Sequence, residues 1–132
     1  MRLTIFILFI TILLFQVNQV VSQCRCTPRT FSDQYNNSNI VFSGIVTNIV
    51  RQGSNNRVTF NVFRTFKGRS SNKLTVITSA STNACGYKFQ KGSDYLVYTT
   101  ISGNYLKVDL CSRTSLLDNA SYDLISIARR KP

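Results

Sequence analysis

The four cysteines constrain this chain more than any other feature, because two stand almost side by side and two lie far downstream. They occupy positions 24, 26, 85 and 111, and the first two directly follow an apolar leader. An even number of cysteines in a short secreted chain favours two disulfides, which can pair in three ways. Pairing Cys24 with Cys26 would close a very short ring, so we expect both to be joined to later segments. A zinc site built from the four thiolates is the competing interpretation.

The first 23 residues have the pattern of a secretory signal peptide. Met1-Arg2 gives a positively charged start, and residues 3–15 are almost wholly apolar. Such a start, a short apolar run and small residues near the cut are typical of a cleaved leader. Cleavage after Gln23 would make Cys24 the new terminus, whereas the small side chain of Ser22 favours cleavage one residue earlier. A membrane anchor is the alternative, but the run is shorter than the roughly 20 apolar residues that a spanning helix needs. We therefore expect a secreted, extracellular protein without a membrane span.

The composition argues against an enzyme. The chain has no His and no Glu, and its 5 acidic residues are scattered aspartates. Without His, the most common general base and zinc ligand is missing. No two aspartates stand together as a pair for acid–base catalysis. We expect no catalytic activity and no cofactor of the chain's own.

Positive charge dominates the sequence. The chain has 16 Lys and Arg residues against 5 acidic ones, which gives a formal net charge of +11. Outside the cell the abundant polyanions are sulfated glycosaminoglycans rather than nucleic acid. Binding to heparin-like glycosaminoglycans or to the matrix is therefore one hypothesis, and nucleic-acid binding is not expected. The alternative is that the charge only keeps a secreted domain soluble, because the basic residues are dispersed apart from Arg129-Arg130-Lys131.

The body of the chain has the patterns of five short strands. Residues 40–50 are rich in β-branched side chains, and Gly44 interrupts them as a bulge or bend would. Residues 57–66 alternate apolar and polar side chains, which predicts a half-buried strand. The apolar positions expected on its inner face are Val58, Phe60, Val62 and Phe66. Three more strands are predicted over residues 74–78, 94–101 and 105–110, with turns at residues 52–56, 67–72 and 102–104.

One helix is predicted at the end of the chain. Ser115 and Asp118 approximate a capping box. Apolar residues then recur at helical spacing and should line a buried face, namely Leu116, Ala120, Leu124 and Ile127. The basic tail would fall in the last turn, where cations complement the helix dipole. Five strands and a terminal helix predict a mainly β fold, a five-stranded Greek-key barrel of the OB type, as one domain over residues 24–132.

Six short motifs follow one another along the chain after the leader. They are Cys24-Arg25-Cys26-Thr27-Pro28, Ile40-Val41-Phe42, Phe66-Lys67-Gly68, Ala84-Cys85-Gly86-Tyr87, Tyr95-Leu96-Val97-Tyr98 and Leu110-Cys111-Ser112. Taken together, in this order and ahead of the expected helix, they resemble the amino-terminal domain of the tissue inhibitors of metalloproteinases, which is a netrin-like module.

The resemblance implies two disulfides, Cys24–Cys85 and Cys26–Cys111, and a secreted inhibitor of zinc metalloproteinases. The α-amine and carbonyl of Cys24 would chelate the catalytic zinc of the enzyme and displace the water that the zinc activates. The enzyme would supply that zinc. The residues expected in the enzyme's substrate cleft are Cys24, Arg25, Cys26, Thr27 and Pro28. Asn83 and Ala84 would pack beside them as a second edge.

The chain also departs from the family pattern. Arg25 stands where the family has a small Thr or Ser, and a long cation that enters a mostly apolar pocket loses its hydration. The chain has no further cysteines for the family's third disulfide in this domain, and we expect it to lack the family's cysteine-rich carboxy-terminal domain. An uncleaved Gln23 would convert the Cys24 amine into an amide. The alternative function is a non-inhibitory netrin-like module that binds matrix or glycosaminoglycans. In either case we expect a monomer.

Two segments match the acceptor pattern for N-glycosylation. They begin at Asn36 and Asn119. Asn36 is expected in a loop, which suits a glycan. Asn119 is expected within the first turns of the helix, where attachment is less favoured.

Overall fold

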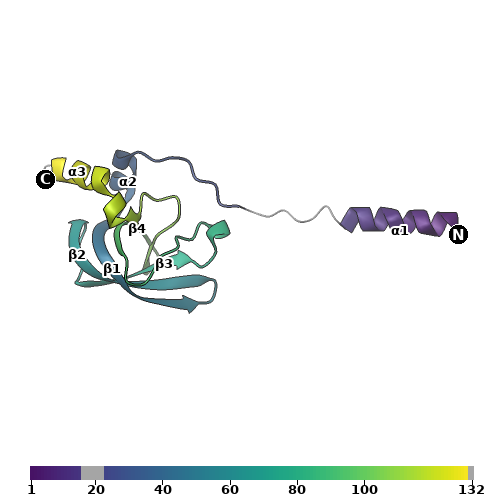
Figure 1. Ribbon diagram of the computed structural model, residues 1–132, viewed down its shortest axis with the longest axis horizontal. Helices are drawn as coiled ribbons and strands as arrows, with labels where there is room; N and C mark the ends of the chain where they lie inside the picture. The colour runs from purple at the N-terminus through teal and green to yellow at the C-terminus, as the bar shows by residue number, and fades with distance from the viewer. Residues whose placement is uncertain (16–22, 131–132) are drawn as a thin grey trace.

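The strands of this protein close into a ring beside two short helices (Figure 1). The computed structural model describes residues 1–15 and 23–130. Its elements are α1 (Arg2–Phe15), α2 (Phe31–Asn37), β1 (Ile40–Gln52), β2 (Asn55–Lys67), β3 (Lys73–Ser79), η1 (Thr82–Ala84), β4 (Asp94–Ser102), β5 (Tyr105–Lys107), β6 (Ser115–Leu116), η2 (Leu117–Asn119) and α3 (Ser121–Arg129).

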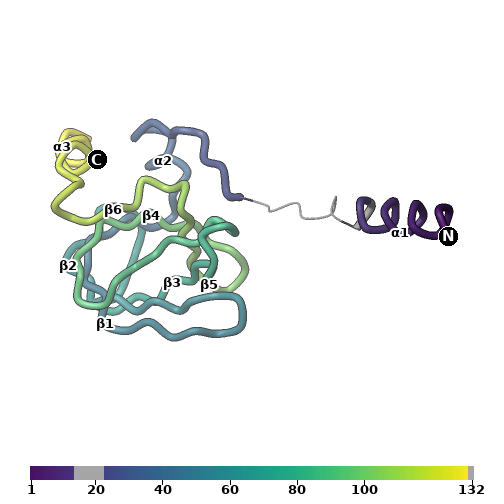
Figure 2. The backbone as a smooth tube through the Cα atoms, turned by 45° about the vertical axis from the view of Figure 1, so that its right-hand side comes forward, coloured from purple at the N-terminus to yellow at the C-terminus, as the bar shows by residue number. Residues whose placement is uncertain are grey.

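The ring follows the order β1-β2-β3-β5-β4, and β4 pairs with β1 to close it. Every pairing is antiparallel except the short parallel contact between β3 and β5. Figure 2 shows the small strands β5 and β6 in place beside the longer ones. A ring of five strands, a carboxy-terminal helix and two disulfides confirm the predicted fold class.

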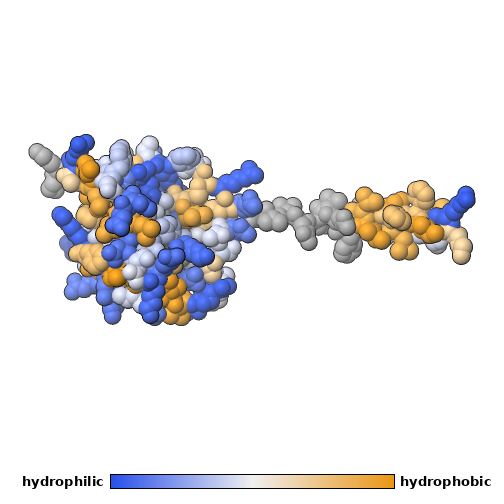
Figure 3. Space-filling model, viewed as in Figure 1, coloured by the Kyte–Doolittle hydropathy of each residue, from blue (hydrophilic) through white to orange (hydrophobic). Residues whose placement is uncertain are grey.

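α1 is apolar along almost its whole length, and Figure 3 shows hydrophobic residues over the face in view. Large side chains such as Leu3, Phe6 and Leu8 are 62–76% exposed, so they have no packing partner in the described structure. None of the helices in the described residues is long and apolar enough to cross a membrane. The predicted cut after Ser22 falls at the edge of residues 16–22, which lie outside the described part of the chain.

The five predicted strands all form, but two of their ends differ from the prediction. The first hairpin is tighter than expected, because Gln52 pairs with Asn55 and only two residues remain in the turn. Gly53 supplies the positive φ of 62° that this turn needs. β5 ends at Lys107 instead of residue 110. The Val108 N–H still bonds to the Ile77 carbonyl, and Asp109 then forms an isolated bridge to Gly86.

The β1–β2 pair contains three bulges. Between Val41/Phe42, Ser43/Gly44 and Val46/Asn48 the pairing shifts, which leaves Phe66, Phe63 and Thr47 as the extra residues. Gly44 therefore stands at a bulge, as its place in the sequence predicted. Bulges bend a strand and re-aim side chains. Phe66 accordingly does not join Val58, Phe60 and Val62, as the alternation had suggested.

The core consists of two clusters on the two sides of the sheet. The larger cluster fills the barrel and contains Phe42, Val46, Val58, Phe60, Val76, Phe89, Tyr95, Val97 and Val108. The smaller one joins the outer face of the barrel to α2, η2 and α3. Its buried members are Phe31, Val41, Leu96, Tyr98 and Ala120, and Phe66, Leu124 and Ile127 pack against it. This second cluster holds the helices on the barrel.

The predicted start of the terminal helix was wrong. Ser115 and Leu116 pair with Leu96 and Tyr95 as β6, so the supposed capping box belongs to a strand and a 3-10 turn. Pairing with an exposed edge outweighed a weak helix signal. α3 starts at Ser121, and Leu116 is 42% exposed rather than part of the buried face. The rest of that face is confirmed, and Arg129 stands in the last turn while Lys131 lies outside the described residues.

α2 was not predicted. The Thr30 side chain accepts the Asp33 N–H at its start, and Phe31 packs into the smaller cluster. Asn36 therefore lies in a helix and not in the expected loop, although it is exposed. Asn119 ends η2 just before α3 and is exposed as well. Both acceptor side chains are thus at the surface.

Candidate functional site

Two disulfides fix the segment that follows the leader. Cys24 is bonded to Cys85 and Cys26 to Cys111, with Cα–Cα distances of 5.1 Å in both. This is the pairing that the resemblance implied. The two bridges lie against each other, since the sulfurs of Cys24 and Cys111 are 3.7 Å apart. Three residues of the chain are therefore held at both ends by covalent bonds.

The disulfides also exclude the competing zinc interpretation. The sulfurs of Cys24, Cys85 and Cys111 lie within 4.8 Å of one another, which is close enough for all three to surround one metal ion. However, all four cysteines are oxidised, and no described cysteine is free. Metals bind the thiolate form of cysteine. These sulfurs are therefore bridges and offer no thiolate to an ion.

The loop around Cys85 brings the second edge beside the first. Asn83 and Ala84 belong to η1, and Cys85 follows in the left-handed conformation with a φ of 63°. Its N–H bonds to the carbonyl of Thr82 at 3.1 Å. A non-glycine residue in this conformation is uncommon and needs support from its surroundings. Here the disulfide to Cys24 and the bonds of the loop provide it.

Gly86 anchors that loop to the barrel. Its N–H bonds to the Ser81 carbonyl at 2.9 Å, and it bridges to Asp109. A Cβ at this position would lie 1.9 Å from the carbonyl oxygen of Ser79. Only glycine allows so close an approach of two backbones. The Cys-Gly pair in the sequence is thus a geometric requirement of this loop.

We call the residues 24–28 together with Asn83 and Ala84 the disulfide ridge. Arg25, Cys26, Thr27 and Pro28 are exposed, as are Asn83 and Ala84, whereas Cys24 is half-buried. The Cys24–Cys85 bridge joins the two edges directly. The structure therefore brings together the residues that the resemblance assigned to one site.

The backbone of Cys24 is not used by the fold. Among the described residues, no hydrogen bond engages its nitrogen or its carbonyl oxygen. Most polar backbone groups in folded proteins are paired within the molecule or with water. A nitrogen and a carbonyl on one residue, both available and fixed by a disulfide, can serve as ligands for an outside group.

Three residues that sequence analysis did not single out support the disulfide ridge through hydrogen bonds. The Asp109 carboxylate accepts the Cys111 N–H at 2.8 Å. Gln34 of α2 accepts the Arg113 N–H at 3.2 Å, and the Arg113 guanidinium donates to the Arg29 carbonyl at 2.9 Å. These bonds connect the loop after Cys111 to the chain just beyond Pro28. No short-range pattern marks Gln34 or Arg113, because their partners are 79 and 84 residues away in the sequence. Asp109 bonds only two residues along the chain, and its spacing from Cys111 is that of a local Asx turn.

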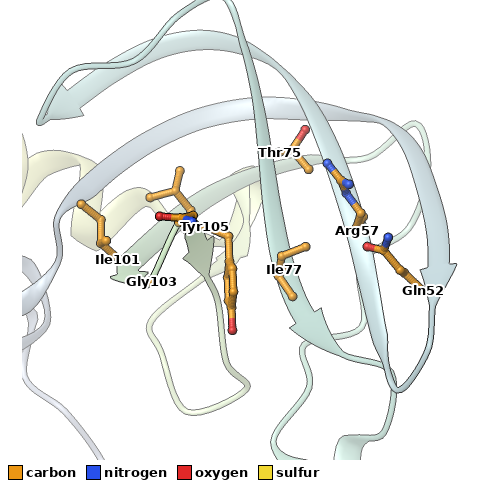
Figure 4. A pocket seen from close by; sticks show the side chains of 9 residues that line it. Gln52, Arg57, Thr75, Ile77, Ile101, Gly103 and Tyr105 are labelled. Atoms are coloured by element: carbon orange, nitrogen blue, oxygen red, sulfur yellow. The ribbon is translucent and has the colours of Figure 1, made fainter.

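A separate cavity of about 590 Å³ opens between β2, β3 and the β4–β5 hairpin (Figure 4). Figure 4 shows Ile101 and Tyr105 on one side, Gln52 and Arg57 on the other, and Thr75 and Ile77 on the strand between them. The residues that line it contain no carboxylate and no cysteine. The cavity shares no residue with the disulfide ridge.

No protein-family model matches this chain, and no curated protein matches its sequence.

Proposed function

We propose that this protein is a secreted inhibitor of zinc metalloproteinases that acts through the disulfide ridge. The observation that carries the proposal concerns the backbone of Cys24. Its nitrogen and carbonyl make no hydrogen bond within the described residues, and two disulfides fix their position. The resemblance to the tissue inhibitors of metalloproteinases supports the same assignment. In this function the protein is no enzyme, and the zinc belongs to the enzyme that it blocks.

The chemistry requires that the leader be removed at Cys24. The nitrogen of Cys24 is then an α-amine, whose ordinary pKa is near 8, so a useful fraction is neutral at physiological pH. A neutral amine and a carbonyl on one residue can bind a zinc ion as a five-membered chelate. The water that the metal activates for hydrolysis would be displaced.

Rigidity makes the ridge suitable for this role. Residues 25–28 are exposed and can enter a cleft, and Asn83 and Ala84 stand beside them as a second contact. Ordering flexible side chains and loops on binding costs affinity. Because the bridges and the Gly86 loop hold both edges before binding, most of that cost is avoided.

The decisive experiment compares three forms of the mature protein. One begins at Cys24, one begins at Gln23, and one begins at Cys24 with its amine acetylated. Each is assayed at micromolar concentration against a panel of zinc endopeptidases. We expect inhibition from the first form alone, because the other two carry an amide nitrogen in place of the amine. Equal thermal stability of the three forms would show that only the terminus differs.

If the form that begins at Cys24 leaves every endopeptidase fully active, the proposal is wrong. The net charge then favours the second candidate, a non-inhibitory netrin-like module that binds glycosaminoglycans or matrix. Hydrophilic residues are spread over the face of the barrel that Figure 3 displays. A secreted form that begins at Gln23 and needs raised salt to leave a heparin resin, with no effect on proteases, would support that candidate.

A further inference from the structure

A groove between α2, β2 and α3 gathers positive charge around an apolar floor. Its volume is about 560 Å³, which is within the range of small-molecule sites. Two arginines, Arg64 and Arg130, line it together with Tyr35, Phe66, Leu124 and Ile127. We call it the α3 groove. It shares no residue with the disulfide ridge.

Both arginines are held by aromatic rings. The guanidinium carbon of Arg64 lies 5.4 Å from the centre of the Phe66 ring, and that of Arg130 lies 4.6 Å from the centre of the Tyr35 ring. The Tyr35 hydroxyl donates to the Phe66 carbonyl at 3.2 Å. The two cation–ring pairs are therefore neighbours across the groove, and the bulge at Phe66 places its ring there.

Lys67 adds a third cation beside them. Its ammonium donates to the carbonyls of Tyr35 at 2.6 Å and Asn36 at 3.1 Å, where it complements the carboxy-terminal end of α2. Arg130 donates to the Asn36 amide oxygen at 3.0 Å. All of these acceptors are uncharged. Burial and then the neighbouring charge of Arg130 lower the pKa of Lys67. Like charges thus stand close together.

No acidic side chain balances this charge. All 5 acidic residues of the chain lie within the described ranges. Asp123 is paired with Arg113, and Asp33 lines a different cavity with Arg29. Within residues 1–15 and 23–130, no ion pair includes Arg64, Lys67 or Arg130. Among the described residues, the three cations at the groove therefore have no anionic partner.

We propose that the α3 groove binds an amphipathic carboxylate, with the carboxylate between Arg64 and Arg130 and the apolar body on Leu124 and Ile127. Arginine binds a carboxylate through paired, charge-assisted hydrogen bonds. The apolar floor selects a ligand with a hydrocarbon part, which a sulfated glycan lacks. The site does not depend on the proposed inhibitory function.

The test uses octanoate as the probe and isothermal titration calorimetry of the secreted protein. Octanol keeps the chain without the charge, and acetate keeps the charge without the chain. We expect one octanoate to bind per protein, with both analogues weaker by about tenfold or more. If octanol binds as tightly as octanoate, the arginines are not a carboxylate site and the proposal is wrong.

Two variants and a matched control locate the site. We expect Arg64→Gln and Arg130→Gln each to weaken octanoate by about tenfold. Arg57→Gln removes the same charge from the separate cavity of Figure 4 and should leave octanoate binding unchanged. Equal weakening by all three would indicate attraction to the overall charge and would overturn the proposal.

The pKa of Lys67 reports binding directly in the unmodified protein, so this measurement does not depend on whether a variant folds. A carboxylate held by Arg130 offsets the repulsion that Lys67 experiences, so octanoate should raise the pKa of Lys67 in a nuclear magnetic resonance titration of the lysine side chains. Lysines far from the groove, such as Lys88 and Lys107, should not respond. If a heparin hexasaccharide moves Lys67 while octanoate does not, the groove takes a polyanion and the proposal is wrong.

Discussion

Tyr98 donates its hydroxyl hydrogen to the carboxylate of Asp123 across 2.7 Å, between the barrel and α3. The Nε of Arg113 donates to the same carboxylate oxygen at 2.9 Å. Tyr98 and Asp123 are both buried, whereas the Arg113 side chain is 30% exposed. Because Arg113 also bonds to the carbonyl of Arg29, this network ties the helix to the chain that leads out of the disulfide ridge.

Loss of the Asp123 charge should weaken this network. We expect Asp123→Asn to lower the free energy of unfolding by about 2–3 kcal/mol, since hydrogen bonds to charged groups contribute about that much. Urea unfolding with the disulfides intact would measure it. Asp118→Asn makes the same chemical change at an exposed position and should cost less than about 0.5 kcal/mol. Equal losses of unfolding free energy in the two variants would contradict a stabilising role for the Asp123 network.

Tyr98 should make the protein less stable in alkaline solution. Burial, and then the hydrogen bond to Asp123 and its charge, raise the pKa of Tyr98 far above the ordinary 10.0. Above pH 10 the unfolded chain loses this proton while the folded chain keeps it, so stability falls as the pH rises. One such group contributes a slope of up to about 1.4 kcal/mol per pH unit.

The variant Tyr98→Phe isolates this effect. It should be less stable at neutral pH by about 1.5–2 kcal/mol, because one hydrogen bond to the charged carboxylate is lost while Arg113 still satisfies that carboxylate. Between pH 10 and 11.5 its free energy of unfolding should fall less steeply than that of the unmodified protein. Parallel curves for the two proteins would show that Tyr98 does not cause the alkaline loss.

The loop of Gly86 offers a third test. In Gly86→Ala the added carbon meets a backbone oxygen of Ser79, which no side-chain rotation can relieve. We expect a loss of about 3 kcal/mol or more in the free energy of unfolding. Gly103→Asn is the control, because Gly103 has a φ of 60° and open space around its Cβ position. Asn tolerates that conformation, so the control should lose less than about 1 kcal/mol. A mild effect of Gly86→Ala would mean that the two backbones can separate.

Arg25 should limit the proposed inhibition. It is exposed, so Arg25→Thr should leave stability within about 0.5 kcal/mol. Removing the desolvation of a cation should strengthen inhibition of endopeptidases with an apolar pocket by about tenfold or more. Arg25→Lys keeps the charge and should bring no gain. Inhibition constants of the three proteins would decide, and weaker inhibition by the Thr variant would indicate a target with an acidic pocket.

The sequence predicted the barrel well because its signals are local and repeated. Alternation in residues 57–66 and turn residues such as Gly53 and Gly103 each report on their immediate neighbours. The two disulfides needed the resemblance as well, since cysteine spacing alone allowed more than one pairing. The residues of the disulfide ridge were likewise assigned through the resemblance and not by the cysteine spacing.

The errors arose where a distant partner decided the structure. Ser115 and Asp118 have the pattern of a helix start. In the structure, however, Ser115 and Leu116 pair with the edge of β4 and form a strand. α2 is only 7 residues long, too short for a periodic pattern, and it exists because Phe31 packs into the smaller cluster. Phe66 changed its surroundings through a bulge, which the alternation of its own strand cannot reveal.

The large sequence separations of the two disulfides also determine when each can form during synthesis of the chain. A ribosome makes Cys24 and Cys26 first, and their partners follow 61 and 85 residues later. Cys26 has no native partner until Cys111 emerges, when nearly the whole barrel has been synthesised. The segment of residues 24–26 is thus made early and cross-linked late. A nascent chain halted before residue 111 cannot complete it.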